Sequence, residues 1–168
     1  TEYWHAEMEV AWATFKDIQD HGEGLIKNIV KRVLNKNKPE LEILERDIKK
    51  LEPTVKKPFP RITYDDALKI LKDKCKVKIP WGKDLRTIEE DELSKLYDTP
   101  IIVTNYPKEV KAFYMKGTEG NPKVVNGCDF IGPEGYGELI GGSEREADPD
   151  KIKKRLIEMG EKPEQYSF

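Results

Sequence analysis

Apolar and polar side chains alternate over the first twelve residues of the chain. An apolar residue at every second position is typical of a β-strand that buries one face, so we expect a strand here. Beyond it the apolar spacing lengthens to three or four residues for roughly twenty positions, which predicts an amphipathic helix. The apolar positions of the predicted strand are Trp4, Ala6, Met8, Val10 and Trp12, and those of the predicted helix are Ile18, Leu25, Ile26, Ile29, Val30, Val33 and Leu34.

Capping boxes mark the starts of two helices. The segment Thr14–Asp17 has the spacing of a capping box at the start of the long helix, and Thr63–Asp66 repeats this spacing before a short one. A third helix is predicted to begin at Thr87. Residues 40–60 are charged and interrupted by prolines, so we interpret them as a polar helical stretch followed by an extended connector.

The pattern changes from helices to strands after Pro100. Asp148-Pro149 then provides an N-cap and a first-turn proline for a closing helix that ends at Gly160. One strand, several helices and a late antiparallel group together predict an α+β fold, an antiparallel sheet flanked by helices. The late strands are expected at 100–107, 110–115, 124–131 and 137–143, with a hairpin-like turn at 118–122.

Composition places the chain among ordinary globular domains. It has 168 residues, of which 37% are apolar and 37% charged, enough for one domain with an ionic surface. Thirty Lys and Arg against 32 Asp and Glu leave a formal net charge of −2, which argues against a dedicated basic nucleic-acid module. No apolar run approaches the ~18 residues that a membrane span needs, so we expect no membrane partner.

The cysteine and histidine content excludes two further classes. Cys75 and Cys128 lie far apart and fit reduced thiols in a cytoplasmic protein better than a disulfide framework. With two His and two Cys, a structural zinc site has almost no ligands available. The chain opens on a full apolar pattern without Met, so we expect it to be a piece of a longer protein.

The polar face of the first predicted strand is a candidate binding surface. Glu7 and Glu9 are two residues apart, which places their carboxylates ~7 Å apart on one face of a strand. At an effective dielectric near 20, two such charges repel each other by about 2 kcal/mol, so this face favours a cation. The cation would be Arg, Lys, Mg²⁺ or the ammonium group of a ligand. The alternative is a solvated face of a one-sided sheet.

A second candidate site lies between Asp129 and Arg145. Asp129 and Glu138 supply the hard oxygen ligands that Mg²⁺ takes when it also keeps water and phosphate. The pair Gly141-Gly142 allows close approach of a ligand to the backbone, or a β-bulge. Strict alternation puts Glu138 and Arg145 on opposite faces, so their joint use requires a bulge, which we expect at the paired glycines.

Four segments together resemble one protein family. Thr1–Trp12, reading Thr-Glu-Tyr-Trp-His-Ala-Glu-Met-Glu-Val-Ala-Trp, is similar to the second strand of motif 2 of class II aminoacyl-tRNA synthetases. Phe59–Ala67 resembles the segment after the first helix of the aspartyl/asparaginyl subgroup. Tyr106–Met115 and Gly137–Arg145 look like the asparaginyl branch, of archaeal or bacterial type. The resemblance covers essentially the whole chain in order.

This resemblance implies a sheet that binds ATP, asparagine and the acceptor end of tRNA. By position, Asp129 and Glu138 match the acids that hold Mg²⁺ on the ATP phosphates, so both are implied as ATP-binding and metal-binding residues. Arg145 matches an arginine that contacts the amino-acid substrate, and Glu7 matches an acid of the amino-acid pocket. Glu138 and Arg145 are the implied catalytic residues. The resemblance further places Gly141, Gly142, Ser143, Lys111 and Phe113 at or near the pocket.

Residues 1–168 lack several parts of the family pattern. Motif 1, which forms the dimer interface, and the first half of motif 2 would precede residue 1, and motif 3 would follow residue 168. The anticodon-binding domain is also missing. The resemblance therefore implies a partial catalytic domain, from a complete protein that forms a homodimer.

The implied reaction is ATP-dependent formation of asparaginyl-adenylate, followed by transfer of asparagine to tRNA. Such a reaction relies on orientation and charge neutralisation, which suits a chain without an evident Ser-His or Cys-His arrangement. Two other readings are open. One is an adenylate-forming enzyme related to asparagine synthetase, with ammonia as acceptor. The other is a truncated, non-catalytic paralogue that binds a ligand or a partner protein.

Overall fold

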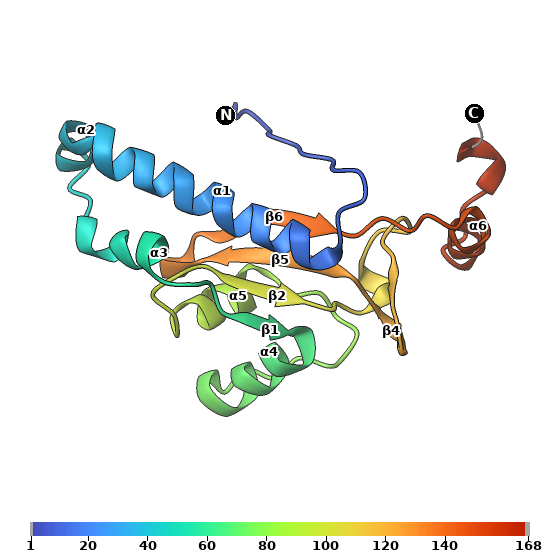
Figure 1. The fold of residues 1–168 in the computed structure, drawn as a ribbon. Helices are drawn as coiled ribbons and strands as arrows, with labels where there is room; N and C mark the ends of the chain where they lie inside the picture. The colour runs from blue at the N-terminus through green and yellow to red at the C-terminus, as the bar shows by residue number, and fades with distance from the viewer. Residues whose placement is uncertain (1, 167–168) are drawn as a thin grey trace.

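A four-stranded sheet forms the centre of the molecule in the computed structural model, which describes residues 2–166. The strand order is β1-β2-β5-β6, with β1 parallel to β2 and the other neighbours antiparallel. A short hairpin, β3-β4, extends from one end of this sheet (Figure 1). The strands are β1 (Arg61–Thr63), β2 (Ile101–Thr104), β3 (Gly117–Thr118), β4 (Asn121–Val125), β5 (Gly127–Gly132) and β6 (Gly137–Ser143).

Helices connect and cover the strands. Within residues 2–166, each helix is either too short or too polar to span a lipid bilayer. The α-helices are α1 (Phe15–Lys36), α2 (Lys38–Ile43), α3 (Glu52–Lys56), α4 (Tyr64–Ile70), α5 (Thr87–Ser94) and α6 (Pro149–Glu158). Shorter turns are η1 (Ile48–Lys50), η2 (Leu71–Cys75), η3 (Lys108–Val110), η4 (Pro133–Gly135) and η5 (Pro163–Tyr166).

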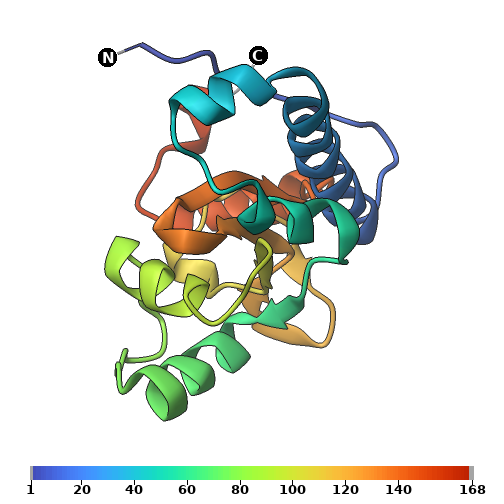
Figure 2. The same ribbon diagram turned by 90° about the vertical axis from the view of Figure 1, so that its left-hand side faces the viewer.

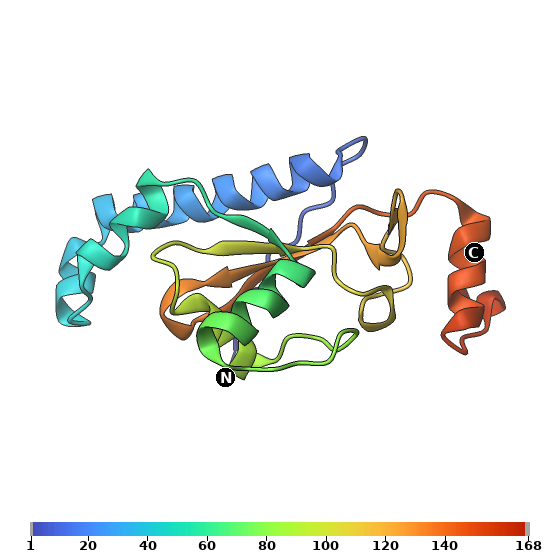
Figure 3. The ribbon, with the colours of Figure 1, turned by 90° about the horizontal axis from the view of Figure 1, so that it is seen from below.

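The sheet lies between two helical layers. Helix α1 runs along one face, and α4 and α5 cover the other (Figures 1 and 3). Seen along the sheet, α2 and α3 lie on the side of α1, opposite α4 and α5 (Figure 2). Strand β2 is buried on both faces, because Ile101 and Val103 join the core under α4 and α5 while Ile102 joins the core under α1. This explains why its sequence is a continuous apolar run.

The long helix begins where the capping box predicts. The Thr14 side chain accepts a hydrogen bond from the Asp17 amide, and the Asp17 carboxylate accepts one from the Thr14 amide. The helix approaches β5 closely at Gly22, where an added Cβ would lie 2.4 Å from Cζ of Phe130. Only a glycine therefore permits this contact between helix and sheet.

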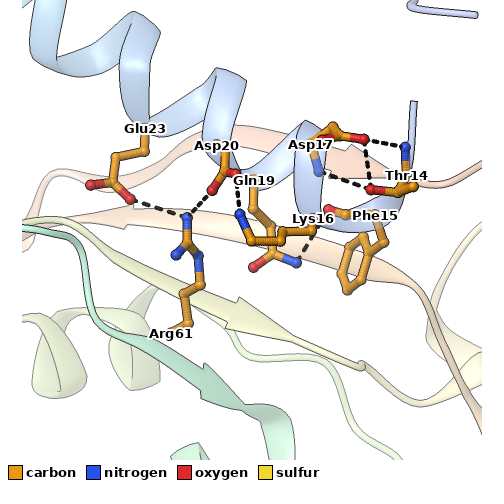
Figure 4. A network of polar contacts seen from close by, with 8 residues as sticks. All are labelled: Thr14, Phe15, Lys16, Asp17, Gln19, Asp20, Glu23 and Arg61. Atoms are coloured by element: carbon orange, nitrogen blue, oxygen red, sulfur yellow. Dashed lines mark hydrogen bonds and ion pairs between the residues drawn. The ribbon is translucent and has the colours of Figure 1, made fainter. Parts of the chain in front are cut away.

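Ion pairs on the solvent-exposed side stabilise the packing of α1 on the sheet. Arg61, which begins β1, donates to the carboxylates of Asp20 at 2.6 Å and Glu23 at 3.3 Å (Figure 4). Glu23 also accepts a hydrogen bond from the Phe59 amide at 3.2 Å. These contacts hold the connector before β1 against α1. Residues 40–60 form the short helical segments α2, η1 and α3 and then an irregular stretch at 57–60, as predicted.

The prediction of a strand over the first twelve residues is wrong for this structure. Residues 2–10 have no regular secondary structure, and no strand among residues 2–166 pairs with them. Thr1 lies outside the described residues. Trp4 is 95% exposed and Trp12 is 99% exposed. The alternation encodes which side chains would be buried, but a strand also needs a neighbour to pair its backbone groups, and the described residues provide none.

The strand predicted at residues 110–115 is also wrong. This segment follows the 3₁₀ turn η3 and folds as a turn, with an isolated bridge between Met115 and Arg145. Tertiary hydrogen bonds stabilise it, since the Lys116 amide donates to the Glu144 carbonyl and the Asn126 amide donates to the Lys116 carbonyl. The turn carries Lys111 back towards the central sheet.

Most of the other late elements agree with the sequence. The strand predicted at 100–107 is realised in β2 and that at 137–143 in β6, while residues 118–122 include the β3-β4 turn. The single strand predicted at 124–131 is wrong, because the chain bends at Asn126 and divides this segment between the end of β4 and β5, which belong to different sheets. Asp148 caps α6, and Gly160 follows that helix with a positive φ of 80°. Helix α6 is held to η3 by an ion pair of 2.6 Å between Lys108 and Glu158. The predicted α+β class is confirmed.

Candidate functional site

Two carboxylates meet on the face of the sheet that α4 and α5 partly cover. In the β5-β6 register Asp129 is opposite Gly141, and Glu138 is opposite Ile131. Asp129 and Ile131 are two residues apart on β5 and therefore point to the same face. The register places Glu138 on that face too, so the structure brings together the two acids that the sequence analysis paired.

A β-bulge decides this arrangement. The register shifts between Phe130 and Ile131, which leaves Leu139 as the extra residue on β6. The shift moves Glu138 onto the face of Asp129. Arg145 lies beyond the end of β6, in an isolated bridge with Met115. An irregularity between Glu138 and Arg145 is confirmed, but its predicted position at the paired glycines is wrong by two residues.

Gly141 makes room for the Glu138 side chain. An added Cβ at Gly141 would lie 2.6 Å from Oε1 of Glu138 and 3.8 Å from Oδ1 of Asp129. The two carboxylates therefore converge above a bare backbone position. Gly142 faces the opposite layer, where its added Cβ would meet Ile18 at 3.2 Å.

Lys111 is the nearest cation to the two acids. Its Nζ lies 2.7 Å from Oδ2 of Asp129, 3.7 Å from Oδ1 of Asp84 and 4.0 Å from the ring centroid of Tyr106. The side chains of Lys111 and Asp129 are only 13% and 9% exposed, so this ion pair is largely shielded from solvent. A buried pair of this kind fixes the carboxylate in one orientation.

Burial perturbs the charges of this cluster. Burial, and then the charge of Asp129, raises the pKa of the Glu138 carboxyl above its ordinary value. Glu90 responds in the same way, because burial and the charges of Glu138 and Asp129 raise its pKa. Burial by itself would lower the pKa of Lys111, but its contact with Asp129 outweighs this effect and the pKa is raised. Clusters of perturbed acids and bases are typical of functional sites.

Tyr106 forms the floor under Lys111. It is fully buried, and its hydroxyl is the one buried side-chain polar atom of the described residues without a hydrogen-bond partner. Burial raises the pKa of this hydroxyl well above its usual range, and the charges of Asp129 and Asp84 raise it further. A buried, unpaired hydroxyl beside converging charges is a feature of sites that bind a polar ligand.

Arg145 contacts the N-terminal segment. Its guanidinium donates to both carboxylate oxygens of Glu9, at 2.8 and 3.0 Å, and lies 4.2 Å from the ring centroid of Tyr114. Half of the Arg145 side chain is exposed. Glu7 is exposed in the same segment. The cation that the sequence analysis sought for this acidic face is thus Arg145, bound to Glu9.

The remaining predicted residues lie around this site. Ser143 ends β6 opposite Gly127, and the register places it on the face of Asp129. The Phe113 ring packs edge-on against two aromatic rings, with centroid distances of 5.4 Å to Tyr114 and 5.2 Å to Tyr166. It therefore stiffens the turn that carries Lys111.

Sequence reasoning missed Asp84, Glu90 and Tyr106. Asp84 lies in a loop and Glu90 in α5, and nothing in their local pattern separates them from other surface acids. Tyr106 carried a signal, since it ends an apolar strand that is bounded by prolines. Tyr106 reaches the site just beyond the end of β2, whereas Glu90 reaches it through the packing of α5 on the sheet.

The donor set fits a magnesium ion that keeps most of its other ligands. Among residues 2–166, no group of three or more His, Cys, Asp or Glu is arranged to hold a metal ion. Mg²⁺, however, is commonly bound by one or two carboxylates, with waters and substrate phosphates completing an octahedron. Asp129 and Glu138 provide those two carboxylates, and the missing side chain of Gly141 lets the Glu138 carboxylate approach Asp129.

The fold and this site belong to a known class. The family profile of class II tRNA synthetases (D, K and N) matches residues 1–168, so the chain belongs to this family of enzymes. Its relatives include the asparagine–tRNA ligases of Thermococcus kodakarensis, 46% identical over the whole chain, and of Pyrococcus abyssi, 45% identical. The chain spans 39% and 38% of these two relatives.

Solved structures of the family agree. The asparaginyl-tRNA synthetase of Pyrococcus horikoshii complexed with asparaginyl-adenylate is 44% identical and superposes with a TM-score of 0.88, over 93% of this chain and 36% of its own. The Entamoeba histolytica enzyme in complex with asparaginyl-adenylate is 28% identical, with a TM-score of 0.77 over 92% of this chain and 35% of its own.

Proposed function

We propose that the complete protein activates asparagine with ATP and transfers it to tRNA, and that residues 1–168 form part of its catalytic domain. The observation that carries this proposal is the convergence of Asp129 and Glu138 over Gly141, in a chain similar to asparagine–tRNA ligases throughout its length. The adenylate named in the structure of a 44% identical relative supports asparagine and ATP as the substrates.

The residues of the site divide the work between nucleotide and amino acid. Asp129 and Glu138 would hold a Mg²⁺ ion at the ATP phosphates, and that ion would neutralise part of the triphosphate charge. The Arg145 guanidinium orients the carboxylate of asparagine, because its planar fork suits two oxygens; the substrate carboxylate takes the place of Glu9, which pairs with this fork in the structure. Glu7 binds the amino group or side-chain amide of the substrate, and Ser143 with the backbone of Gly141 and Gly142 borders the pocket.

The reaction then needs positioning rather than a protein nucleophile. The asparagine carboxylate attacks the α-phosphate of ATP, a new bond forms between them, and pyrophosphate leaves. The terminal ribose hydroxyl of tRNA afterwards displaces AMP from the adenylate. Correct orientation of two bound reactants can supply much of the rate enhancement.

The wider setting of the protein follows from the same proposal. Its partners are asparagine, ATP and the acceptor end of tRNA, and the complete protein forms a homodimer through segments outside residues 1–168. The protein is cytoplasmic, which agrees with the free thiols of Cys75 and Cys128.

Exchange of pyrophosphate into ATP tests this function in the complete protein. We expect exchange with asparagine and little with aspartate, and Glu138→Ala should reduce the rate at least about 100-fold because it removes one of the two carboxylates proposed to hold Mg²⁺ at the phosphates. Glu119→Ala, in the exposed β3-β4 turn, is the matched control and should leave the rate unchanged.

Acceptor assays separate the other readings. Asparagine-dependent charging of tRNA supports the ligase, whereas ammonia-dependent synthesis of asparagine from aspartate would replace it with the synthetase. If Glu138→Ala exchanges pyrophosphate at the wild-type rate, Glu138 is not a residue of the active site. If the complete protein shows no exchange with any amino acid, the interpretation as a non-catalytic paralogue is favoured.

A further inference from the structure

The carboxylates of this site need a counter-charge before any ligand is present. Burial, and then the charges of Glu138, Asp129 and Asp84, raises the pKa of Glu90, so these four acids lie within reach of one another's charges. Four carboxylates in a partly buried site repel one another by several kcal/mol. Among the described residues, Lys111 is the cation in contact with them.

Several contacts hold the Lys111 side chain in a defined position. Its side chain is 13% exposed, and its ammonium contacts Asp129 at 2.7 Å and lies over the Tyr106 ring at 4.0 Å. The turn that carries it is fixed on both sides, since η3 is tied to α6 and Lys116 is paired through its backbone with Glu144. A flexible surface lysine would not be held by an ion pair, an aromatic face and two anchored flanks.

The Lys111 ammonium lies beside the carboxylates that the proposed function assigns to a metal ion. Lys111 Nζ lies against Oδ2 of Asp129, while Oδ1 of Asp129 lies on the side of Gly141, where the Glu138 carboxylate also converges. A divalent cation that bound Asp129 would therefore meet a positive charge a few ångströms away. This repulsion opposes binding unless additional negative charge arrives with the metal.

We infer that Lys111 is a resident cation that holds Asp129 in place and keeps divalent metal weakly bound until nucleotide phosphates accompany it. The inference rests on the proposed function, from which it takes Asp129 and Glu138 as the metal ligands. It makes Lys111 a positioning residue that couples metal binding to ATP binding. The triphosphate offsets the ammonium charge, so metal and nucleotide bind together.

Titration of the complete protein with Mn²⁺, followed by the electron paramagnetic resonance signal of the free ion, tests this coupling. In the absence of ATP, Lys111→Met and Lys111→Gln should bind Mn²⁺ about tenfold more tightly than wild type, because the competing charge is gone. Lys111→Arg keeps the charge and should behave like wild type. The matched control is Lys116→Met, which removes a lysine paired with Glu144 outside the cluster.

The direction of the change separates this role from a merely structural one. If Lys111 only supported the fold of the site, its removal would weaken Mn²⁺ binding. A gain that persists in the double variant Lys111→Met with Asp129→Asn would come from another site and would overturn the inference, as would folded Lys111 variants that bind no tighter than wild type.

Wild-type protein provides a second measurement that does not depend on the variants. Mn²⁺ should bind weakly alone and at least tenfold more tightly with a non-hydrolysable ATP analogue, after correction for the metal bound by the free analogue. Equal affinity in both conditions would overturn the inference. Neither titration needs asparagine or tRNA, so a failure here is distinct from a failure of pyrophosphate exchange.

Discussion

At the scale of single residues, charges in this molecule depend on the partners that tertiary contacts bring to them. Lys111 and Asp129 illustrate this in the site, and Glu134 illustrates it away from the site. Glu134, in η4, forms ion pairs with Arg46 and, at 3.1 Å, with Lys50. These contacts join the connector after α2 to the loop that precedes β6, a link of 88 residues in sequence.

The Glu134 pairs make a pH-dependent contribution to stability. The hydrogen bond from Arg46 lowers the pKa of Glu134 from 4.5 to about 2. A carboxyl whose pKa is lower in the folded state stabilises the fold when ionised, so the contribution is complete above about pH 4.5 and is lost as the pH falls to about 2. It amounts to at most about 3 kcal/mol.

Thermal unfolding of wild type and Glu134→Gln measures this contribution. The wild type should unfold at a higher temperature than the variant at neutral pH, and the difference should disappear as the solution is acidified through that range. Glu52→Gln, which breaks the exposed pair with Lys56, should change the melting temperature little at any pH. A pH-independent difference would show that the Glu134 charge is not responsible.

At the scale of elements, the local sequence pattern determines that α1 forms, and tertiary contacts determine which of its faces is buried. Its capping box and apolar period fix where the helix starts and that it forms, as the sequence predicts. They do not fix which face packs: Ile26 is buried, whereas Leu25 and Ile29, also apolar, are half exposed. The close contact at Gly22 selects the buried face.

Alanine substitutions at two glycines of α1 should therefore have opposite effects on the stability of the protein. Gly22→Ala should destabilise the protein by about 1 to 3 kcal/mol, because its Cβ would overlap the Phe130 ring that fills the core under the helix. Gly24→Ala should stabilise it by about 0.5 to 1 kcal/mol, because its Cβ meets nothing within 4 Å and alanine favours a helix. Urea unfolding of both variants measures the two changes, and equal effects would refute the close contact.

At the scale of the whole molecule, the N-terminal segment is the part that the described fold does not cover. Trp4 and Trp12 stand in solvent, and Glu9 with Arg145 is the polar link from this segment to the sheet. Exposed apolar residues at every second position form a face suited to burial against further chain. The relatives of this chain are more than twice its length, so they contain such chain.

Tryptophan fluorescence examines this face. In the 168-residue chain, emission should be close to that of tryptophan in water and acrylamide should quench it readily, since Trp81, the third tryptophan, is also 46% exposed. In the complete protein the emission should shift to shorter wavelength as Trp4 and Trp12 become buried. Identical spectra in the two forms would show that the segment stays exposed.

The sequence by itself determined the elements whose signals are local. Capping residues set the starts of α1 and α4, and Asp148 with Pro149 sets the start of α6. Short-range hydrogen bonds and side-chain period govern these elements, so the sequence is sufficient for them. The roles of Asp129 and Glu138 come from the family resemblance and stay a prediction.

Only the tertiary structure decided which side chains meet. The bulge at Leu139 places Glu138 beside Asp129, the turn after η3 brings Lys111 to them, and strand pairing fails for the N-terminal segment. Each outcome depends on contacts between residues far apart in sequence. A periodic pattern specifies a buried face but not the partner that buries it, because pairing, register and charge neutralisation are properties of two segments at once.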